Sequence, residues 1–263
     1  IKDKKGIRKD TLDYIFSQDE LSPTQRQKYE TLVEEGKRKL QYEGKNPDVS
    51  MVVGRALYHL DKKEECVSYL EAAIEEPNMK TQIDAWALDY LGKIYFLKGE
   101  YEKSRVALIE ARSLNATKNA THDIQNTLLL FGFEDVYDDW ETFETDHIIF
   151  HIQDPKMLGD VTSYLNERTK AYEVIQEFFG SELPKKIDFF IWNSQLDGYR
   201  YLRKSIGFSE TSACLIHAYS AQTPGHELTH ILSHYAVPNF EKKIKKPREC
   251  KVLEKIDELI SLF

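Results

Sequence analysis

Residues 88–111 read LDYLGKIYFLKGEYEKSRVALIEA. Apolar and small residues recur at helical spacing in both halves of this stretch, which predicts two amphipathic helices. Lys98, Gly99 and Glu100 between them predict a tight turn. The stretch therefore indicates a helical hairpin.

A second copy of the pattern begins 38 residues upstream. Aligning the copies pairs four positions: Gly54 with Gly92, Cys66 with Ser104, Leu70 with Leu108, and Ala73 with Ala111. Small residues recur where two helices must approach closely, and large residues recur where they fill the gap. The sequence thus predicts repeated hairpins over about 47–117. Because repeats need neighbours to cover their apolar faces, we expect capping helices at 22–43 and 119–139.

The pattern resembles the tetratricopeptide repeat, which places a Leu-Gly pair, a Tyr, and later two Ala around a bulky residue at these spacings. The usual period is about 34, so the longer offset implies inserted residues near Pro77 to Thr81. The first copy departs from the pattern at Leu57 and Cys66, where the family has Tyr and Ala. The resemblance implies an all-α repeat domain, placed at 1–139, that binds a protein partner. The alternative is a generic pair of helical hairpins.

The composition excludes several classes of protein. With 44 acidic and 36 basic residues among 263, the net charge is −8, and the basic run Lys242–Arg248 is short, which argues against a nucleic-acid partner. No window holds 18 uninterrupted apolar residues, so no membrane span is predicted. Three scattered cysteines, Cys66, Cys214 and Cys250, form no disulfide framework and leave the compartment open. Since the sequence begins at Ile1, an extracytoplasmic location after removal of a signal peptide is slightly favoured over a cytoplasmic one.

The periodicity changes near Trp140. From there the sequence predicts a strand at 142–152, a helix at 157–179, a strand at 187–192, a helix at 195–205, a strand at 213–218, and helices at 224–236 and 248–262. A run of helices followed by mixed strands and helices is typical of two domains, with a boundary near 138–142. The predicted fold class is α+β, with a second domain at 140–263.

The second domain contains the motif His226-Glu227-Leu228-Thr229-His230. Residues four apart lie on one face of a helix, so both imidazoles can reach one Zn²⁺. Glu227 lies beside them and can take a proton from a water on the metal. Thr223 is expected to cap this helix and Pro224 to occupy its first turn. The alternative is a buried helix whose histidines bind backbone groups.

A catalytic zinc site needs a third protein ligand and leaves its fourth position to water. His234 lies about 12 Å along the helix axis from His226, too far to share one ion, so we expect it to have a supporting or structural role. The metzincin arrangement would need a histidine where this chain has Ala236. A carboxylate from the following segment remains, and the candidates are Glu241, Glu249, Glu254 and Glu258.

Three further side chains near the motif are candidates for stabilising an oxyanion: His217, Tyr219 and Tyr235. The alternative for each is a place in the core or at the rim of the site.

The motif and a glutamate early in the next predicted helix resemble the gluzincins, zinc peptidases of the peptidase-MA-like group, some of which also carry tetratricopeptide repeats. The resemblance covers roughly 140–263. It implies a zincin-like α+β catalytic domain, Glu249 as the third zinc ligand, and a helical subdomain beyond this point. Two features depart from the family: Glu249 is followed by Cys250 and Lys251 instead of small residues, and Pro224-Gly225 directly precedes the first ligand.

These observations lead to one hypothesis and one rival. The hypothesis is a zinc-dependent metallopeptidase acting on a protein or peptide substrate, with His226, His230 and Glu249 on the metal and Glu227 as general base. The rival is a non-catalytic interaction scaffold in which the repeats bind a partner and the peptidase-like domain is degenerate. The zinc content of the protein separates the two.

Overall fold

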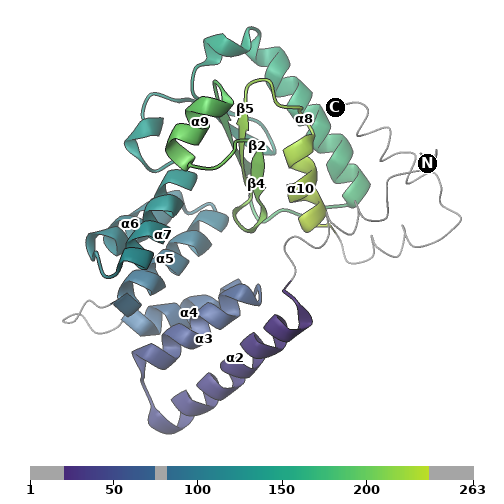
Figure 1. Cartoon of the computed structure of the whole chain (residues 1–263). Helices are drawn as coiled ribbons and strands as arrows, with labels where there is room; N and C mark the ends of the chain where they lie inside the picture. The colour runs from purple at the N-terminus through teal and green to yellow at the C-terminus, as the bar shows by residue number, and fades with distance from the viewer. Residues whose placement is uncertain (1–20, 75–81, 237–263) are drawn as a thin grey trace, which may run out of the picture. The chain divides into compact units, whose positions relative to one another are not determined.

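The computed structural model describes residues 21–74 and 82–236, which divide into a unit at 21–136 and a unit at 137–236 (Figure 1). The first unit is helical and the second combines helices with a five-stranded sheet. This confirms the mixed α and β class predicted from the sequence. The helix predicted at 248–262 and the insertion near 77–81 lie outside the described residues.

The helical unit is a succession of helices, each packed on the next. Its described helices are α2 (Pro23–Glu43), α3 (Pro47–His59), α4 (Lys63–Ile74), α5 (Gln82–Leu97), α6 (Tyr101–Ser113) and α7 (Lys118–Leu130). Side-chain caps from Ser22, Asn46 and Thr117 begin α2, α3 and α7. The flanking helices predicted at 22–43 and 119–139 are therefore present, but the second ends nine residues earlier than predicted.

The hairpins α3–α4 and α5–α6 make the same close approach between their helices. A Cβ added at Gly54 would lie 2.7 Å from Leu70 Cδ2, and one added at Gly92 would lie 2.6 Å from Leu108 Cγ. Neither contact leaves space for a side chain. The leucine of each second helix thus packs directly on the backbone of the first, which explains why both positions are glycine.

The same two carbonyl groups accept a hydrogen bond from the second helix. Cys66 Sγ donates to Gly54 O at 3.0 Å, and Ser104 Oγ donates to Gly92 O at 2.7 Å. Residues 38 positions apart in sequence therefore perform the same two tasks. The two hairpins are a structural repeat.

The turns of the two hairpins also match. Asp61 and Gly99, again 38 residues apart, both have positive φ, at 60° and 74°. The backbone bond from Lys62 N to Leu57 O, 2.9 Å, corresponds to the bond from Glu100 N to Tyr95 O, also 2.9 Å. Glycine suits this conformation, and aspartate is among the few other residues that tolerate it.

The second unit is built around a mixed sheet. Its strands are β1 (Glu141–Glu144), β2 (Ile148–Ile152), β3 (Ile187–Trp192), β4 (Phe208–Glu210) and β5 (Leu215–Tyr219), in the order β1-β2-β3-β5-β4. The three central strands are parallel, and β1 and β4 pair antiparallel at the two edges. The helices are α8 (Val161–Phe179), α9 (Gln195–Leu202) and α10 (His226–His234), and α8 and α10 lie side by side (Figure 1).

The central strand β3 is buried along its whole length. Its sequence, IDFFIW, is apolar except for Asp188, because both faces of a central strand are covered by other elements. Asp188 accepts hydrogen bonds from His151 and Lys185, and these partners hold its pKa below the usual range although burial alone would raise it. The strand predicted at 187–192 is confirmed.

Several predicted boundaries in this unit are wrong. The single strand predicted at 142–152 is the hairpin β1–β2, because Thr145 closes a turn by binding Ile148 through backbone and side chain. The helix predicted from 157 begins at Val161, since Gly159 has a φ of 70° and Asp160 caps the first turn. The short edge strand β4 was not predicted.

No helix in the described ranges is long and apolar enough to cross a membrane.

Candidate metal centre

The motif residues lie on α10, whose apolar face packs into the core of the second unit. Leu228, Ile231 and Leu232 are fully buried, and the helix packs on α8, β4 and β5. The helix begins at His226, with Gly225 in the capping position and no side-chain cap. The expected cap from Thr223 is therefore wrong, and the first helical residue is itself the first candidate ligand.

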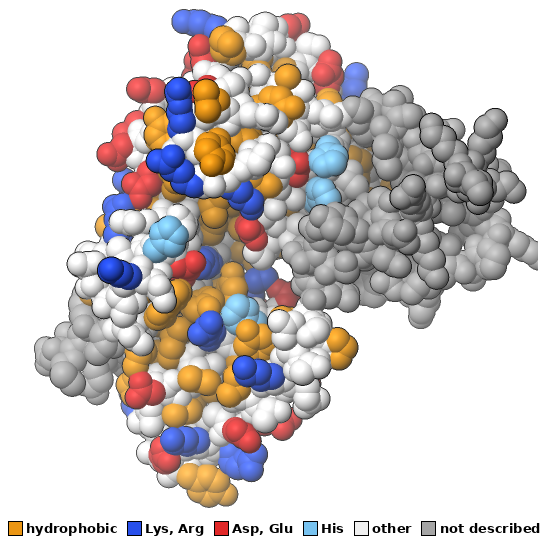
Figure 2. All heavy atoms as spheres, viewed as in Figure 1, with side chains coloured by type: hydrophobic (Ala, Val, Ile, Leu, Met, Phe, Trp, Pro, Cys, Tyr) orange, Lys and Arg blue, Asp and Glu red, His pale blue; other side chains and the backbone are white. Residues whose placement is uncertain are grey.

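The two candidate histidines are neighbours on the outer side of α10. The ring centroids of His226 and His230 are 5.3 Å apart and the ring planes meet at 78°. The His226 side chain is 63% exposed and His230 is half-buried. Figure 2 shows histidine side chains gathered on the surface over α10. The four-residue spacing thus brings both imidazoles together, as predicted.

Glu227 points into the protein from the same turn of α10. It is 3% exposed, and its Oε1 lies 3.8 Å from His226 Nε2. Burial raises the pKa of Glu227 to about 7, and the positive charge of Lys204 opposes this rise. Lys204 is exposed, with its Nζ 3.7 Å from the ring centroid of Phe208 on strand β4. A buried carboxylate therefore lies beside two imidazoles that are open to solvent.

The loop before α10 contacts this carboxylate. Gln222 Nε2 donates a hydrogen bond to Glu227 Oε1 at 3.2 Å. The carbonyl of Gln222 accepts a bond of 2.8 Å from Arg168 Nη2, on α8. A path of two hydrogen bonds therefore joins α8 to Glu227.

The two imidazoles fit a zinc ion, because neutral histidine nitrogens are among its preferred ligands. Within residues 21–74 and 82–236, no group of three histidine, cysteine, aspartate or glutamate side chains is placed to hold a metal. Glu249, the expected third ligand, lies outside the described residues, as do Glu241, Glu254 and Glu258. The described part of the chain supplies two of the three predicted ligands.

The structure places the other candidates in different surroundings. His217 is fully buried, stacks on Phe190 with centroids 4.6 Å apart, and its Nδ1 accepts the indole N–H of Trp192 at 3.0 Å. Tyr235 donates its hydroxyl to Thr211 O at 3.0 Å. These contacts are those of packed core and rim residues, which was the alternative considered for both.

Two candidates lie nearer the surface. His234 is exposed, with its ring 4.8 Å from that of Tyr235. Tyr219 ends β5, and its carbonyl accepts the backbone N–H of Gln222 at 2.9 Å.

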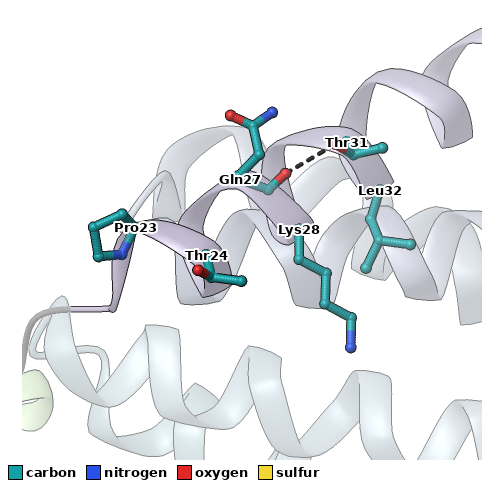
Figure 3. A pocket seen from close by; sticks show the side chains of 6 residues that line it. All are labelled: Pro23, Thr24, Gln27, Lys28, Thr31 and Leu32. Atoms are coloured by element: carbon teal, nitrogen blue, oxygen red, sulfur yellow. Dashed lines mark hydrogen bonds between the residues drawn. The ribbon is translucent and has the colours of Figure 1, made fainter.

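A hollow on the helical unit offers little acid–base chemistry. It runs along one face of α2 and is lined by Pro23, Thr24, Gln27, Lys28, Thr31 and Leu32 (Figure 3). Its one titratable side chain is Lys28.

Sequence reasoning missed Gln222 and Arg168. Arg168 carried a signal, because it occupies the apolar stripe of α8 between Leu165 and Tyr172, where a charged residue needs a specific partner. It is 2% exposed. Gln222 carried none, since it lies in an irregular loop without periodicity.

In comparisons with known proteins, no family model matches the chain, and no curated protein or solved structure matches it significantly.

Proposed function

We propose that this protein is a zinc-dependent peptidase, with a zincin-like catalytic domain and an N-terminal domain of tetratricopeptide-like repeats. The observation that carries the proposal is the arrangement on α10, where His226 and His230 have ring centroids 5.3 Å apart and Glu227 lies buried beside them. The motif, its helical conformation and its exposed imidazoles together favour a metal site over a purely structural helix.

His226 and His230 would hold the zinc ion, with Glu249 as the proposed third ligand. Zinc supplies Lewis-acid polarisation of a carbonyl group at such a site. Glu227 is the proposed general base. Its carboxylate takes a proton from the attacking water and passes it to the nitrogen of the leaving amine, so its protonation state is restored at the end of the cycle.

The edge of the sheet supports an extended peptide as substrate. Among the described strands β4 pairs with β5 alone, and α10 packs against β4. An extended chain can add to such an edge through main-chain hydrogen bonds. A peptide bound there would run past the helix that carries the motif.

The helical unit supports a role in binding a protein partner. An aromatic cluster from α2, α3 and α5 surrounds the buried Tyr90. Its half-buried members are Tyr29, Tyr58, His59 and Trp86, and the rings of Tyr29 and His59 stack with centroids 4.9 Å apart. Hydrophobic side chains gather over the helical unit in Figure 2. Aromatic side chains are enriched where proteins bind one another. We propose that the repeats recruit the substrate or a partner.

Zinc content and hydrolysis test the proposal together. The purified chain should hold about one zinc ion and cleave peptides, and His226→Ala should lose both properties. The matched control is His122→Ala, which removes an exposed histidine from α7. Equal zinc content in the wild type and His226→Ala would overturn the metal site. A chain that binds no zinc but retains partner binding would favour the scaffold alternative.

A further inference from the structure

Arg168 is a buried cation that forms no ion pair among the described residues. Its side chain is 2% exposed, and among the described residues no carboxylate forms an ion pair with it and its Nε has no hydrogen-bond partner. Burying a charge is costly unless it is paired and hydrogen-bonded. The placement of this guanidinium therefore needs an explanation.

The contacts of Arg168 show what it holds. Its guanidinium carbon lies 3.3 Å from the ring centroid of Tyr164, one turn earlier on α8. The Tyr164 ring covers one face of the guanidinium, and Nη2 at its edge donates a hydrogen bond to the carbonyl of Gln222 at 2.8 Å. Arg168 thus fixes the backbone of the loop that leads from β5 to α10.

The loop residue Gln222 is restrained on other sides as well. Its backbone N–H binds Tyr219 O at 2.9 Å. Its side-chain amide lies against Gly207, where an added Cβ would be 2.7 Å from Gln222 Oε1. Gly207 has a φ of 99°, a conformation that residues with a side chain rarely adopt. The missing side chain leaves room for the amide of Gln222.

The restrained amide reaches Glu227. The bond from Gln222 Nε2 to Glu227 Oε1, 3.2 Å, is the hydrogen bond that reaches this carboxylate among the described residues. This hydrogen bond joins the loop before α10 to the first turn of α10, so it forms only when both are in place. The bond holds the same oxygen, Oε1, that lies 3.8 Å from His226 Nε2.

We propose that Gln222 is a positioning residue that holds the carboxylate of Glu227 for proton transfer, and that Arg168 anchors Gln222. The inference rests on the proposed peptidase function and deepens it. A general base must lie within hydrogen-bond reach of the proton it takes, and a displacement of about 1 Å can lower a rate by about a hundredfold. The restraint from α8 through the loop prevents such a displacement.

The kinetic test compares Gln222→Met with Gln176→Met in the full zinc-loaded chain. Gln176 is a matched control because its amide also binds a neighbouring loop, donating to Ser181 O at 3.0 Å in the same unit. We expect Gln222→Met to lower kcat by about tenfold to a hundredfold with KM and zinc content unchanged, and Gln176→Met to leave kcat unchanged. An unchanged kcat in Gln222→Met would overturn the inference.

A second readout needs neither zinc nor hydrolysis. In the ¹⁵N-labelled metal-free chain, the side-chain amide signal of Gln222 is the one that disappears in Gln222→Met. Glu227→Leu should move this signal towards the position of freely solvated glutamine amides, and Arg168→Lys should also shift it. A signal unaffected by Glu227→Leu would overturn the contact. If the zinc-loaded wild type cleaves no peptide, the peptidase proposal fails, while the amide signal still decides whether Gln222 holds Glu227.

Discussion

His59 lies at the end of α3 between aromatic rings. Its ring stacks on Tyr29 with centroids 4.9 Å apart, and Tyr58 and Tyr90 meet it edge to face. Among the described residues its Nε2 has no hydrogen-bond partner. Burial lowers the pKa of His59, and the positive charges of Arg55 and Lys93 lower it further.

This lowered pKa predicts a pH-dependent stability. Between the folded pKa and the unfolded value of about 6.5, the unfolded chain binds more protons at this site, so the free energy of unfolding falls as the pH drops through that range. His59→Phe keeps a ring for Tyr29 and removes the titration. Urea unfolding at pH 7.5 and pH 5.0 should show a smaller loss of stability in His59→Phe than in the wild type.

The matched comparison is His122→Phe, which removes an exposed histidine from the same unit. This variant leaves the buried imidazole of His59 in place, so its stability should depend on pH more nearly as in the wild type than that of His59→Phe does. Equal loss of stability in the wild type and His59→Phe would show that His59 does not contribute to the pH dependence.

Glu227 provides a prediction about chemistry instead of stability. Glu227→Gln keeps the shape of the side chain but removes the basic carboxylate. If Glu227 is the general base, the variant should retain zinc and lose hydrolysis by about 10²- to 10⁴-fold. Metal analysis and peptide cleavage measure the two properties on one sample.

An exposed glutamate on α8 serves as the control. Glu173→Gln makes the same chemical change away from the motif and should leave hydrolysis as in the wild type. Full hydrolysis by Glu227→Gln would exclude Glu227 as the general base.

Among the elements, the hairpins α3–α4 and α5–α6 owe their geometry to glycines at the helix crossings. Since a Cβ at Gly92 would lie 2.6 Å from Leu108 Cγ, Gly92→Leu should separate α5 from α6 and lower the free energy of unfolding by about 1–3 kcal/mol. Gly54→Leu should behave alike, because the Leu70 side chain lies 2.7 Å from its added Cβ. Thermal unfolding followed by circular dichroism measures both.

The control for these variants is Val106→Leu on α6. Val106 is 61% exposed, so a larger side chain there meets solvent instead of a neighbouring helix. If Gly54→Leu and Gly92→Leu lowered the melting temperature no more than Val106→Leu, the close helix approach at the two glycines would not contribute to stability.

For the molecule as a whole, the proposed zinc site needs residues from separate parts of the sequence. α10 contributes two imidazoles, and Glu249 lies nineteen positions after His230. A neutral amide is a poor replacement for an anionic oxygen ligand, so Glu249→Gln should bind zinc substoichiometrically, in contrast to Glu227→Gln. Zinc analysis after dialysis measures the difference.

Glu173→Gln on α8 is the control, because it removes an exposed carboxylate that is not a candidate ligand. Retention of full zinc by Glu249→Gln would exclude Glu249 as the third ligand and leave the other candidates, Glu254 first among them.

The sequence by itself determined the features that depend on local periodicity and composition. Glycines, small residues and leucines spaced at a constant offset of 38 indicated the two helical hairpins, because each hairpin solves the same packing problem with side chains close in sequence. The apolar run at 187–192 predicted the buried strand β3. The four-residue spacing of His226 and His230 predicted their proximity, since one turn of helix is enough to create it.

The tertiary structure alone decided the features formed between distant segments. The order β1-β2-β3-β5-β4 depends on the pairing of β2 with β3 and of β3 with β5, which lie far apart in sequence, and no local pattern encodes these pairings. The same holds for the surroundings of Glu227, because Arg168 on α8 reaches Gln222 across 54 positions of the chain. A spacing in the sequence can place two side chains on one helix face, but the hydrogen bonds that orient a buried carboxylate arise only when separate elements pack together.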